Sequence, residues 1–442
     1  MLIGFLAAVP SWAISPTMLQ FLKWESEHNL GTWSQGVNFK SEELPIPYFE
    51  IDISGDQMYR LSSFRDWYFS ADRGPHGLTI DFAEYLPKDI AQFFKFERDG
   101  KTFIRWPMNP LDQEFRGRMS RYFDEIKLPY RYFSAEQSSL RGFRTASKSV
   151  IVQLPGSEHS FSFKTGTSTV GQREGFERPN PSRWAHFNRK LSDYYHGLRG
   201  QLKTLEVAWE AGAIMLPPFQ AETDNSLNIR LMEAVSSGER YQMTGFVLHD
   251  KKEIARLAKL AKMTEAEYRQ TLSRAFGSFL VELNLVLGFR ISSAHLQNVR
   301  FELDRDFRPT GKVILLDLTD GSPVRAIFEK NGQASLLEDW RKYVGDTWVG
   351  TEEYTPNKVI ETPVWIQSDM RDHFAASAWF GPMDKAAMRE GAEERLRSLG
   401  SFSGKVSMRD TGDLVMKFDS AEDLYGRYRK EPPGNCHGRF MK

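Results

Sequence analysis

A polar loop at residues 293–298 holds the side chains best suited to chemistry. It reads Ser-Ala-His-Leu-Gln-Asn, and an apolar run at residues 313–316 soon follows and ends at Asp317. Mg²⁺ prefers oxygen ligands and usually takes one or two protein carboxylates or amides together with phosphate oxygens. Asn298 and Asp317 are therefore candidate ligands of the metal that accompanies a nucleoside triphosphate. His295 is expected to shape the loop or to touch the phosphates.

A second group of candidates lies more than a hundred residues earlier. Lys164 ends a strand-like run, and the polar loop after it contains Thr167 and Ser168. An ammonium group neutralises phosphate charge, and hydroxyl groups donate hydrogen bonds to phosphate oxygens. Glu206 and Glu210 lie four residues apart in a segment that we expect to be helical, so both face one side of that helix. Either could pair with Lys164, and the spacing does not choose between them.

The elements that must position these residues follow a consistent order. Residues 264–287 have apolar side chains at helical spacing and begin with a capping box formed by Thr264 and Glu267. The other predicted elements are strands at residues 149–154 and 161–164, a helix at 188–211, strands at 213–216 and 241–248, and two strands at 299–303 and 312–316 that pair around Gly311.

In this order of elements the chain resembles the kinase-like superfamily over residues 149–325. The loop at residues 295–298 is most similar to the His-x-Gln-Asn loop of NRPS-independent siderophore synthetases of the aerobactin-synthetase type, and its spacing is also similar to that of lipid and atypical kinases. The resemblance implies a two-lobed kinase-like fold that uses ATP and magnesium. It also implies that Lys164 binds the phosphates while Asn298 and Asp317 bind the metal.

The chain also departs from the kinase pattern. Kinases place a catalytic aspartate five residues before the asparagine, and this chain has Ser293 there. A hydroxyl acceptor needs such a base, whereas a carboxylate is already a nucleophile. The departure favours adenylyl transfer to a carboxylate over phosphoryl transfer, with the acceptor unknown. Asp320 is a rival of Asp317, and Arg173 matches the arginine of the synthetase loop only loosely.

The predicted fold class is α+β, with a kinase-like N-lobe at residues 149–250 and a C-lobe with a helical extension at residues 251–442. Residues 14–140 form a β-rich extension of unknown role, with a hairpin at residues 93–106 that turns at Asp99-Gly100. Near the C-terminus, residues 384–399 are predicted to be a helix.

Composition excludes several classes of protein. The 442 residues contain 58 Lys and Arg and 58 Asp and Glu, so no net field favours nucleic acid as a partner. Cys436 is the only cysteine, which excludes a disulfide within the chain and a thiolate zinc site. No run approaches about 18 apolar residues, so we expect no transmembrane helix.

Residues 1–13 resemble a secretory signal peptide without its basic region, because an apolar run leads to Ser11-Trp12-Ala13. Cleavage would make the protein periplasmic or secreted, where ATP is scarce; without cleavage the protein would be cytoplasmic. Export keeps two alternatives open: a non-catalytic kinase-like binding protein, and a hydrolase of envelope polymers whose groove would be lined by tryptophans. The sequence does not predict the oligomeric state.

Overall fold

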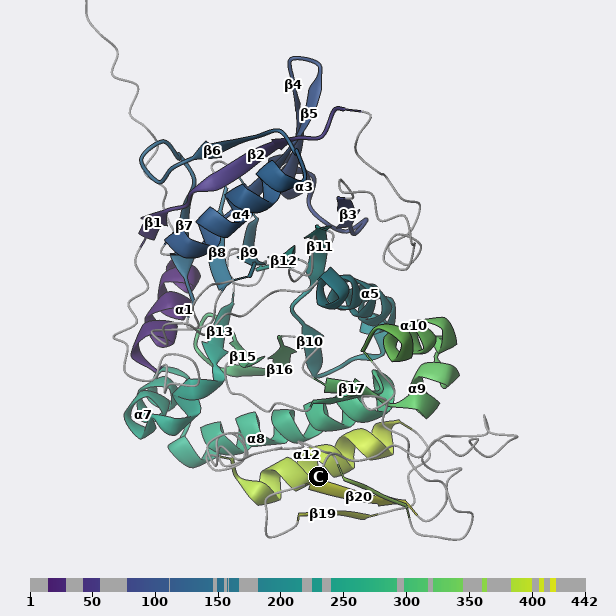
Figure 1. Ribbon diagram of the computed structural model, residues 1–442. Coiled ribbons are helices and arrows are strands. Elements are labelled where there is room, and N and C mark those ends of the chain that lie inside the picture. The colour runs from purple at the N-terminus through teal and green to yellow at the C-terminus, as the bar shows by residue number, and fades with distance from the viewer. Residues whose placement is uncertain are drawn as a thin grey trace, which may run out of the picture.

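The protein is a mixed α+β structure built from several sheets (Figure 1). The computed structural model describes residues 15–28, 43–55, 78–110, 112–145, 149–154, 157, 159–166, 182–216, 225–232, 240–291, 298–316, 321–344, 360–363, 383–399, 405–408 and 414–418. The predicted α+β class is confirmed. None of the helices in these ranges is long and apolar enough to cross a membrane.

A seven-stranded antiparallel sheet forms the upper part of the molecule. Its strands, in spatial order, are β1 (Glu43–Pro45), β7 (Arg141–Arg144), β8 (Ser149–Gln153), β9 (Ser160–Lys164), β12 (Ser226–Leu231), β11 (Glu210–Met215) and β3 (Thr79–Phe82). Side chains alternate between its two faces. Phe161, Phe163 and Ile229 belong to the core on one face, so Ser162, Lys164 and other polar residues point to the opposite face.

A smaller four-stranded sheet packs with two helices over the apolar face of the large sheet. It consists of β4 (Lys95–Arg98), β5 (Lys101–Pro107), β2 (Tyr48–Asp52) and β6 (Tyr130–Phe133), and the helices are α3 (Lys88–Phe94) and α4 (Gln113–Glu125). The predicted turn at Asp99-Gly100 is confirmed, because both residues have positive φ angles of 52° and 71°. This geometry matches the two-residue hairpin turns that Asp-Gly favours.

Hydrogen bonding crosses the division that we predicted between residues 140 and 149. Strands β1 and β3 come from the N-terminal extension, yet they pair with β7 and β11 in the large sheet. The extension and the predicted N-lobe therefore share one sheet. The division into domains itself stays a prediction.

A second four-stranded sheet lies below the seven-stranded sheet. It contains β10 (Leu205–Val207), β16 (Pro309–Leu315), β15 (Val299–Leu303) and β13 (Tyr241–Thr244), with β10 and β16 parallel. Val299, Phe301 and Leu303 join the core that contains helix α8 (Glu265–Val281). The turn between β15 and β16 spans residues 304–308, where Phe307 has a φ of 62°, so the prediction of a turn at Gly311 is wrong.

The helices below this sheet agree with the sequence signals at their ends. Helix α8 begins with the predicted capping box, continues as a π-helix at Glu282–Val286, and stops before Gly288, whose φ is 70°. Helix α12 (Lys385–Ser398) is capped by Asp384. The two helices touch backbone to backbone, since a Cβ added at Gly277 would lie 1.9 Å from the carbonyl oxygen of Met388.

The remaining described elements are short helices and strands. They are α1 (Pro16–Glu27), η1 (Arg199–Gln201), η2 (Gly245–His249), α7 (Lys251–Leu260), β14 (Phe289–Ile291), β17 (Gly321–Pro323), α9 (Arg325–Lys330), α10 (Ala334–Val344), β18 (Ile360–Pro363), β19 (Lys405–Met408) and β20 (Leu414–Phe418).

The long helix predicted at residues 188–211 is wrong. Helix α5 (Ser182–Leu198) ends earlier, and the chain then forms β10 and β11. Because Leu205, Val207 and Ala213 are buried in a shared core, packing in two sheets overrides the helical propensity of this alanine-rich stretch. The predicted strand at residues 241–248 is also shorter, since β13 ends at Thr244 and η2 follows.

Candidate functional site

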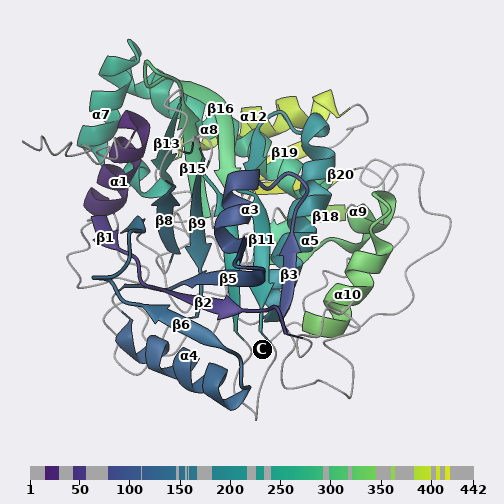
Figure 2. The ribbon, with the colours of Figure 1, turned by 90° about the horizontal axis from the view of Figure 1, so that it is seen from above.

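The seven-stranded sheet and the β10-β16-β15-β13 sheet lie next to each other in the middle of the molecule (Figures 1 and 2). The lower face of the seven-stranded sheet carries Lys164, Asn228 and Arg230. The upper face of the β10-β16-β15-β13 sheet carries Asn298 and Arg300. The two faces meet where Arg300 Nη1 lies 3.8 Å from Sδ of Met232, which follows β12.

Asn298 immediately precedes β15, as predicted. Its carbonyl oxygen accepts a 2.9 Å hydrogen bond from the backbone N–H of Leu316, the residue before Asp317. Only 6% of Asn298 is exposed. The hairpin therefore brings the Asn298 backbone to the end of β16.

Lys164 stands at the end of β9, as predicted. It pairs in register with Asn228 on one side and with Ser149 on the other, and it is half-buried. Its side chain belongs to the same face as Ser162 and Arg230 by the alternation of the strands. Lys164 is thus on the sheet face that lies toward Asn298.

Glu206 and Glu210 do not share a helical face, because they lie in strands of two different sheets. Glu206 in β10 is 4.0 Å from Nζ of Lys312 in β16, and partial burial raises its pKa against the effect of that ammonium. Glu210 in β11 accepts hydrogen bonds from Nε and Nη2 of Arg230. The described ion pair of Glu210 is therefore with Arg230 and not with Lys164. The only acidic residue of α5 is Asp193, which bonds Arg189.

Arg300 is a prominent residue of the site that we did not predict. It is buried, its Nη1 donates to Oε1 of Gln242 at 2.9 Å, and burial lowers its pKa to about 10, with Arg230 adding to the effect and Glu25 opposing it. The group remains a cation at neutral pH. Its position two residues after Asn298 could have identified Arg300 as a site residue from the sequence, because residues i and i+2 of an extended chain share a face.

Some buried polar atoms on these faces have no hydrogen-bond partner within the described ranges. They include Oε2 of Glu210 and Nε of Arg300. Most buried polar groups in folded proteins are paired, so such atoms call for an explanation. A polar ligand between the two sheets would supply their missing partners.

A small apolar cluster interrupts the polar upper face. Ala208, Ile314 and Leu316 are buried against one another, apart from the main cores. Ile314 pairs with Arg300 in register, so the cluster adjoins the charged residues of the same face.

Four predicted site residues lie outside the described residues: Thr167, Ser168, His295 and Asp317. Ser293, Asp320 and Arg173 lie outside them as well. Their assigned roles stay predictions.

The donor atoms suit magnesium. Asn298 offers an amide oxygen and Asp317 a carboxylate, both of which are oxygen ligands of the kind Mg²⁺ takes alongside phosphates. Within the described ranges, no group of three or more His, Cys, Asp or Glu residues could hold a metal by itself.

Comparison with known proteins finds similarity at the level of structure. No protein-family model matches the sequence. No curated protein matches it either.

Several solved structures share the arrangement of the chain. The ATP-bound aerobactin synthetase IucA from a hypervirulent pathotype of Klebsiella pneumoniae aligns with a TM-score of 0.51 at 12% identity, over 80% of this chain and 63% of that chain. The aerobactin synthetase IucC from the same source gives 0.50 at 9% identity, over 82% and 60%. The petrobactin biosynthesis protein AsbB from Bacillus anthracis gives 0.53 at 12% identity, over 88% and 70%.

The chain spans between 60% and 63% of the length of the aerobactin synthetases that it matches. At these identities the likeness is one of fold. The protein therefore has the fold seen in structures of siderophore synthetases, one of them bound to ATP.

Proposed function

We propose that the protein is an ATP- and Mg²⁺-dependent ligase of kinase-like fold that activates a carboxylate by adenylyl transfer. The observation that carries the proposal is the β15–β16 hairpin, which sets Asn298 beside the residue before Asp317 in a fold shared with an ATP-bound synthetase. Lys164 on the facing sheet supports it, because its charge suits the phosphates.

The lack of a catalytic aspartate in the loop favours adenylation over phosphoryl transfer. Ser293 replaces the aspartate that would accept a proton from a hydroxyl acceptor. In adenylation, a carboxylate oxygen of the acceptor attacks the α-phosphorus of ATP. The bond from that phosphorus to the bridging oxygen breaks, and pyrophosphate leaves with the electron pair. No proton transfer is needed in this step.

Each residue then has a distinct task. Lys164 holds the phosphates from above, while Asn298 and Asp317 would hold the magnesium ion from below. Magnesium supplies neutralisation of the phosphate charge. His295 shapes the loop that precedes Asn298, and Thr167 and Ser168 donate hydroxyl hydrogen bonds to phosphate. The apolar cluster of Ala208, Ile314 and Leu316 would pack against the adenine ring of ATP.

The first experiment is thermal unfolding with and without Mg-ATP. A ligand that binds only the folded state stabilises it by about 2.7 kcal/mol at a hundredfold excess over Kd. We expect a rise in Tm that requires magnesium and is lost in Asp317→Ala and in Lys164→Met. Lys101→Met is the matched control, because the exposed Lys101 begins β5 of another sheet and pairs with Asp52.

The products then distinguish the reaction classes. Adenylation releases pyrophosphate and makes ATP–pyrophosphate exchange depend on a carboxylic acid, whereas phosphoryl transfer releases ADP. A wild-type Tm that does not change at millimolar Mg-ATP would contradict the enzyme proposal. It would leave a non-catalytic binding protein or a hydrolase as the alternatives.

Export remains a separate proposal, since residues 1–13 lie outside the described residues. Helix α1 starts at Pro16 and is capped by the side chain of Ser15, which accepts from the N–H of Met18 at 3.1 Å. Cleavage after Ala13 would therefore leave the whole helix and its cap in the mature chain. Mass spectrometry of the mature N-terminus tests this proposal.

A further inference from the structure

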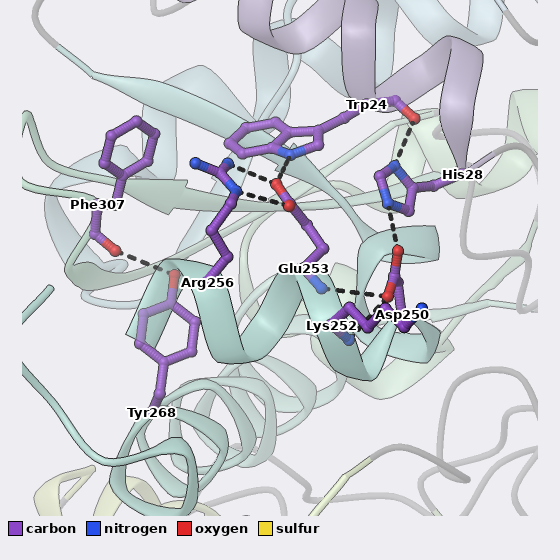
Figure 3. Close-up of polar contacts among 8 residues, drawn as sticks. All are labelled: Trp24, His28, Asp250, Lys252, Glu253, Arg256, Tyr268 and Phe307. Atoms are coloured by element: carbon purple, nitrogen blue, oxygen red, sulfur yellow. Dashed lines mark hydrogen bonds and ion pairs between the residues drawn. The ribbon is translucent and has the colours of Figure 1, made fainter. Parts of the chain in front are cut away.

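Helix α1 joins parts of the molecule that are far apart in sequence (Figure 1). One end of the helix is bonded to α7. Nε1 of Trp24 donates to Oε1 of Glu253 at 2.8 Å, and Nε2 of His28 lies 3.1 Å from Oδ2 of Asp250 (Figure 3). The Trp24 ring also joins the lower core and packs edge-on against Tyr241 of β13.

The two carboxylates that bind this end of α1, Glu253 and Asp250, are held in place by contacts within α7 (Figure 3). Arg256 bonds both carboxylate oxygens of Glu253, at 2.6 and 2.7 Å. Asp250 caps α7 by accepting from the N–H groups of Lys252 and Glu253. The hydrogen bonds from Arg256 and from the Glu253 N–H lower the pKa of Glu253 and of Asp250, respectively, so both remain carboxylates at neutral pH. Both acceptor carboxylates are thus held by groups that do not belong to α1.

The other half of the helix packs on the seven-stranded sheet. Met18, Phe21 and Leu22 form a separate apolar cluster with three residues of that sheet and its border: Phe143 in β7, Ile151 in β8 and Met232 after β12. The same short helix therefore buries one end in each of the two layers that carry the polar faces.

Helix α1 also touches the candidate site directly. The guanidinium carbon of Arg300 lies 4.4 Å from the centroid of the Phe21 ring. Arg300 shares its strand face with Asn298 and bonds Gln242 of the neighbouring strand. The position of α1 thus bears on the face that is proposed to hold magnesium and phosphate.

One of the short covalent links between the two sheets is on the other side. Between Val207 and Glu210 the chain passes directly from β10 in the lower sheet to β11 in the upper sheet. Figure 1 shows α1 at one side of the paired sheets and β10–β11 toward the opposite side. The chain also passes from β12 to β13 between Met232 and Tyr241, which both contact α1, and an opening motion about residues 208–209 would break the contacts that α1 makes with both sheets.

We propose that α1 is a clasp that holds the seven-stranded sheet against the polar face of the β10-β16-β15-β13 sheet and thereby sets the affinity of the intervening site for Mg-ATP. The statement about affinity rests on the proposed function, whereas the mechanical statement does not. Docked α1 preorganises the spacing of Lys164 and Asn298. Release of α1 lets the layers separate, so a smaller fraction of molecules is competent to bind.

Hydrogen exchange measured by mass spectrometry on the full chain tests the clasp. The variant is Trp24→Phe with His28→Leu, which removes both hydrogen bonds to α7 but keeps apolar side chains. Leu19→Ala is the control, since Leu19 is 54% exposed on the same helix. Trp24→Phe alone is the milder variant if the double variant does not fold. Calorimetric titration with Mg-ATP gives Kd.

We expect exchange to rise together in β7–β8 and in β13–β15, and Kd to rise about tenfold, because each lost hydrogen bond contributes modestly. Leu19→Ala should change neither quantity. Faster exchange that is confined to residues 15–28, or to one of the two sheets, would overturn the clasp. An unchanged Kd with looser sheets would overturn its control of the site.

The two proposals fail in different ways. A wild-type chain that does not bind Mg-ATP contradicts the proposed function, and the exchange pattern then decides about the clasp alone.

Discussion

A buried carboxylate at the end of α8 gives the sharpest test of the fold. Glu282 is fully buried and accepts hydrogen bonds from the backbone N–H groups of Lys203 at 2.8 Å, Thr204 at 2.9 Å and Leu205 at 2.6 Å. Its Oε1 also lies 2.5 Å from Nε of Arg395 in α12. One side chain thus fixes α8, α12 and the start of β10.

Glu282→Gln changes this arrangement in a calculable way. Gln keeps one carbonyl oxygen, but its NH₂ group would face the donors of Lys203 and Arg395. Removing one partner of a buried ion pair typically costs about 3–5 kcal/mol, because the other charge remains buried and unpaired. A domain is stable by only about 5–15 kcal/mol, so the variant should be close to the limit of folding.

Urea unfolding followed by circular dichroism measures the effect. We expect the midpoint of Glu282→Gln to fall by about 1–2 M with little change in the m-value. Glu390→Gln is the matched control, since it breaks an Arg–Glu pair between the same two helices. Arg274 and Glu390 are both about half exposed, at 50% and 51%, so that variant should lose at most about 1 kcal/mol.

A double variant separates charge from packing. Glu282→Gln with Arg395→Gln removes the unpaired cation and should be less destabilised than the sum of the single variants. Equal costs for Glu282→Gln and Glu390→Gln would refute the reasoning, because burial would then have no effect on the pair.

Three further predictions concern stability. Gly277→Ala should destabilise the protein by about 1–3 kcal/mol, because the added Cβ would lie 1.9 Å from a carbonyl oxygen of α12. Gly197→Ala should stabilise it by about 0.4–1 kcal/mol, because nothing lies within 4 Å of the added Cβ. Thermal unfolding compares the two variants. Burial, aided by Lys190 and Arg189, lowers the pKa of His186 to about 3, so the unfolded chain takes up a proton below about pH 6.5 while the folded chain does not. Stability should fall by roughly 1.4 kcal/mol per pH unit from that pH down toward pH 3, and His186→Phe should reduce this slope in urea titrations. Thr264→Ala should cost about 1 kcal/mol by removing the capping hydrogen bonds with Glu267, with helix loss visible by circular dichroism.

Local signals in the sequence predicted local structure well. The capping box at Thr264, the turn at Asp99-Gly100 and the helix predicted at residues 384–399 each depend on residues close to one another in sequence. The hairpin that brings Asn298 to the end of β16 was also predictable, because its strands are close in sequence. Such features need no knowledge of distant partners.

Features that depend on distant partners were not predictable. The stretch at residues 205–215 has small and apolar residues that fit a helix or a strand, and its pairing partners lie in β16 and β12. Only those pairings show that Glu206 and Glu210 belong to different sheets. The same limit applies to Arg230, whose position beside Glu210 and toward Arg300 follows from strand order rather than from spacing along the chain.

The charges between the sheets are costly features that the fold retains. Arg230, Glu210 and Arg300 are buried, and replacing buried ion pairs by apolar residues often leaves a protein equally or more stable. Stability alone therefore does not explain a polar interior between two sheets that each have a well-packed apolar face. The proposed charged ligand would account for it, because a metal ion and phosphate oxygens would pair with Oε2 of Glu210 and Nε of Arg300, which have no hydrogen-bond partner among the described residues. Under the proposed function, the two apolar faces build the fold and the two polar faces bind the ligand.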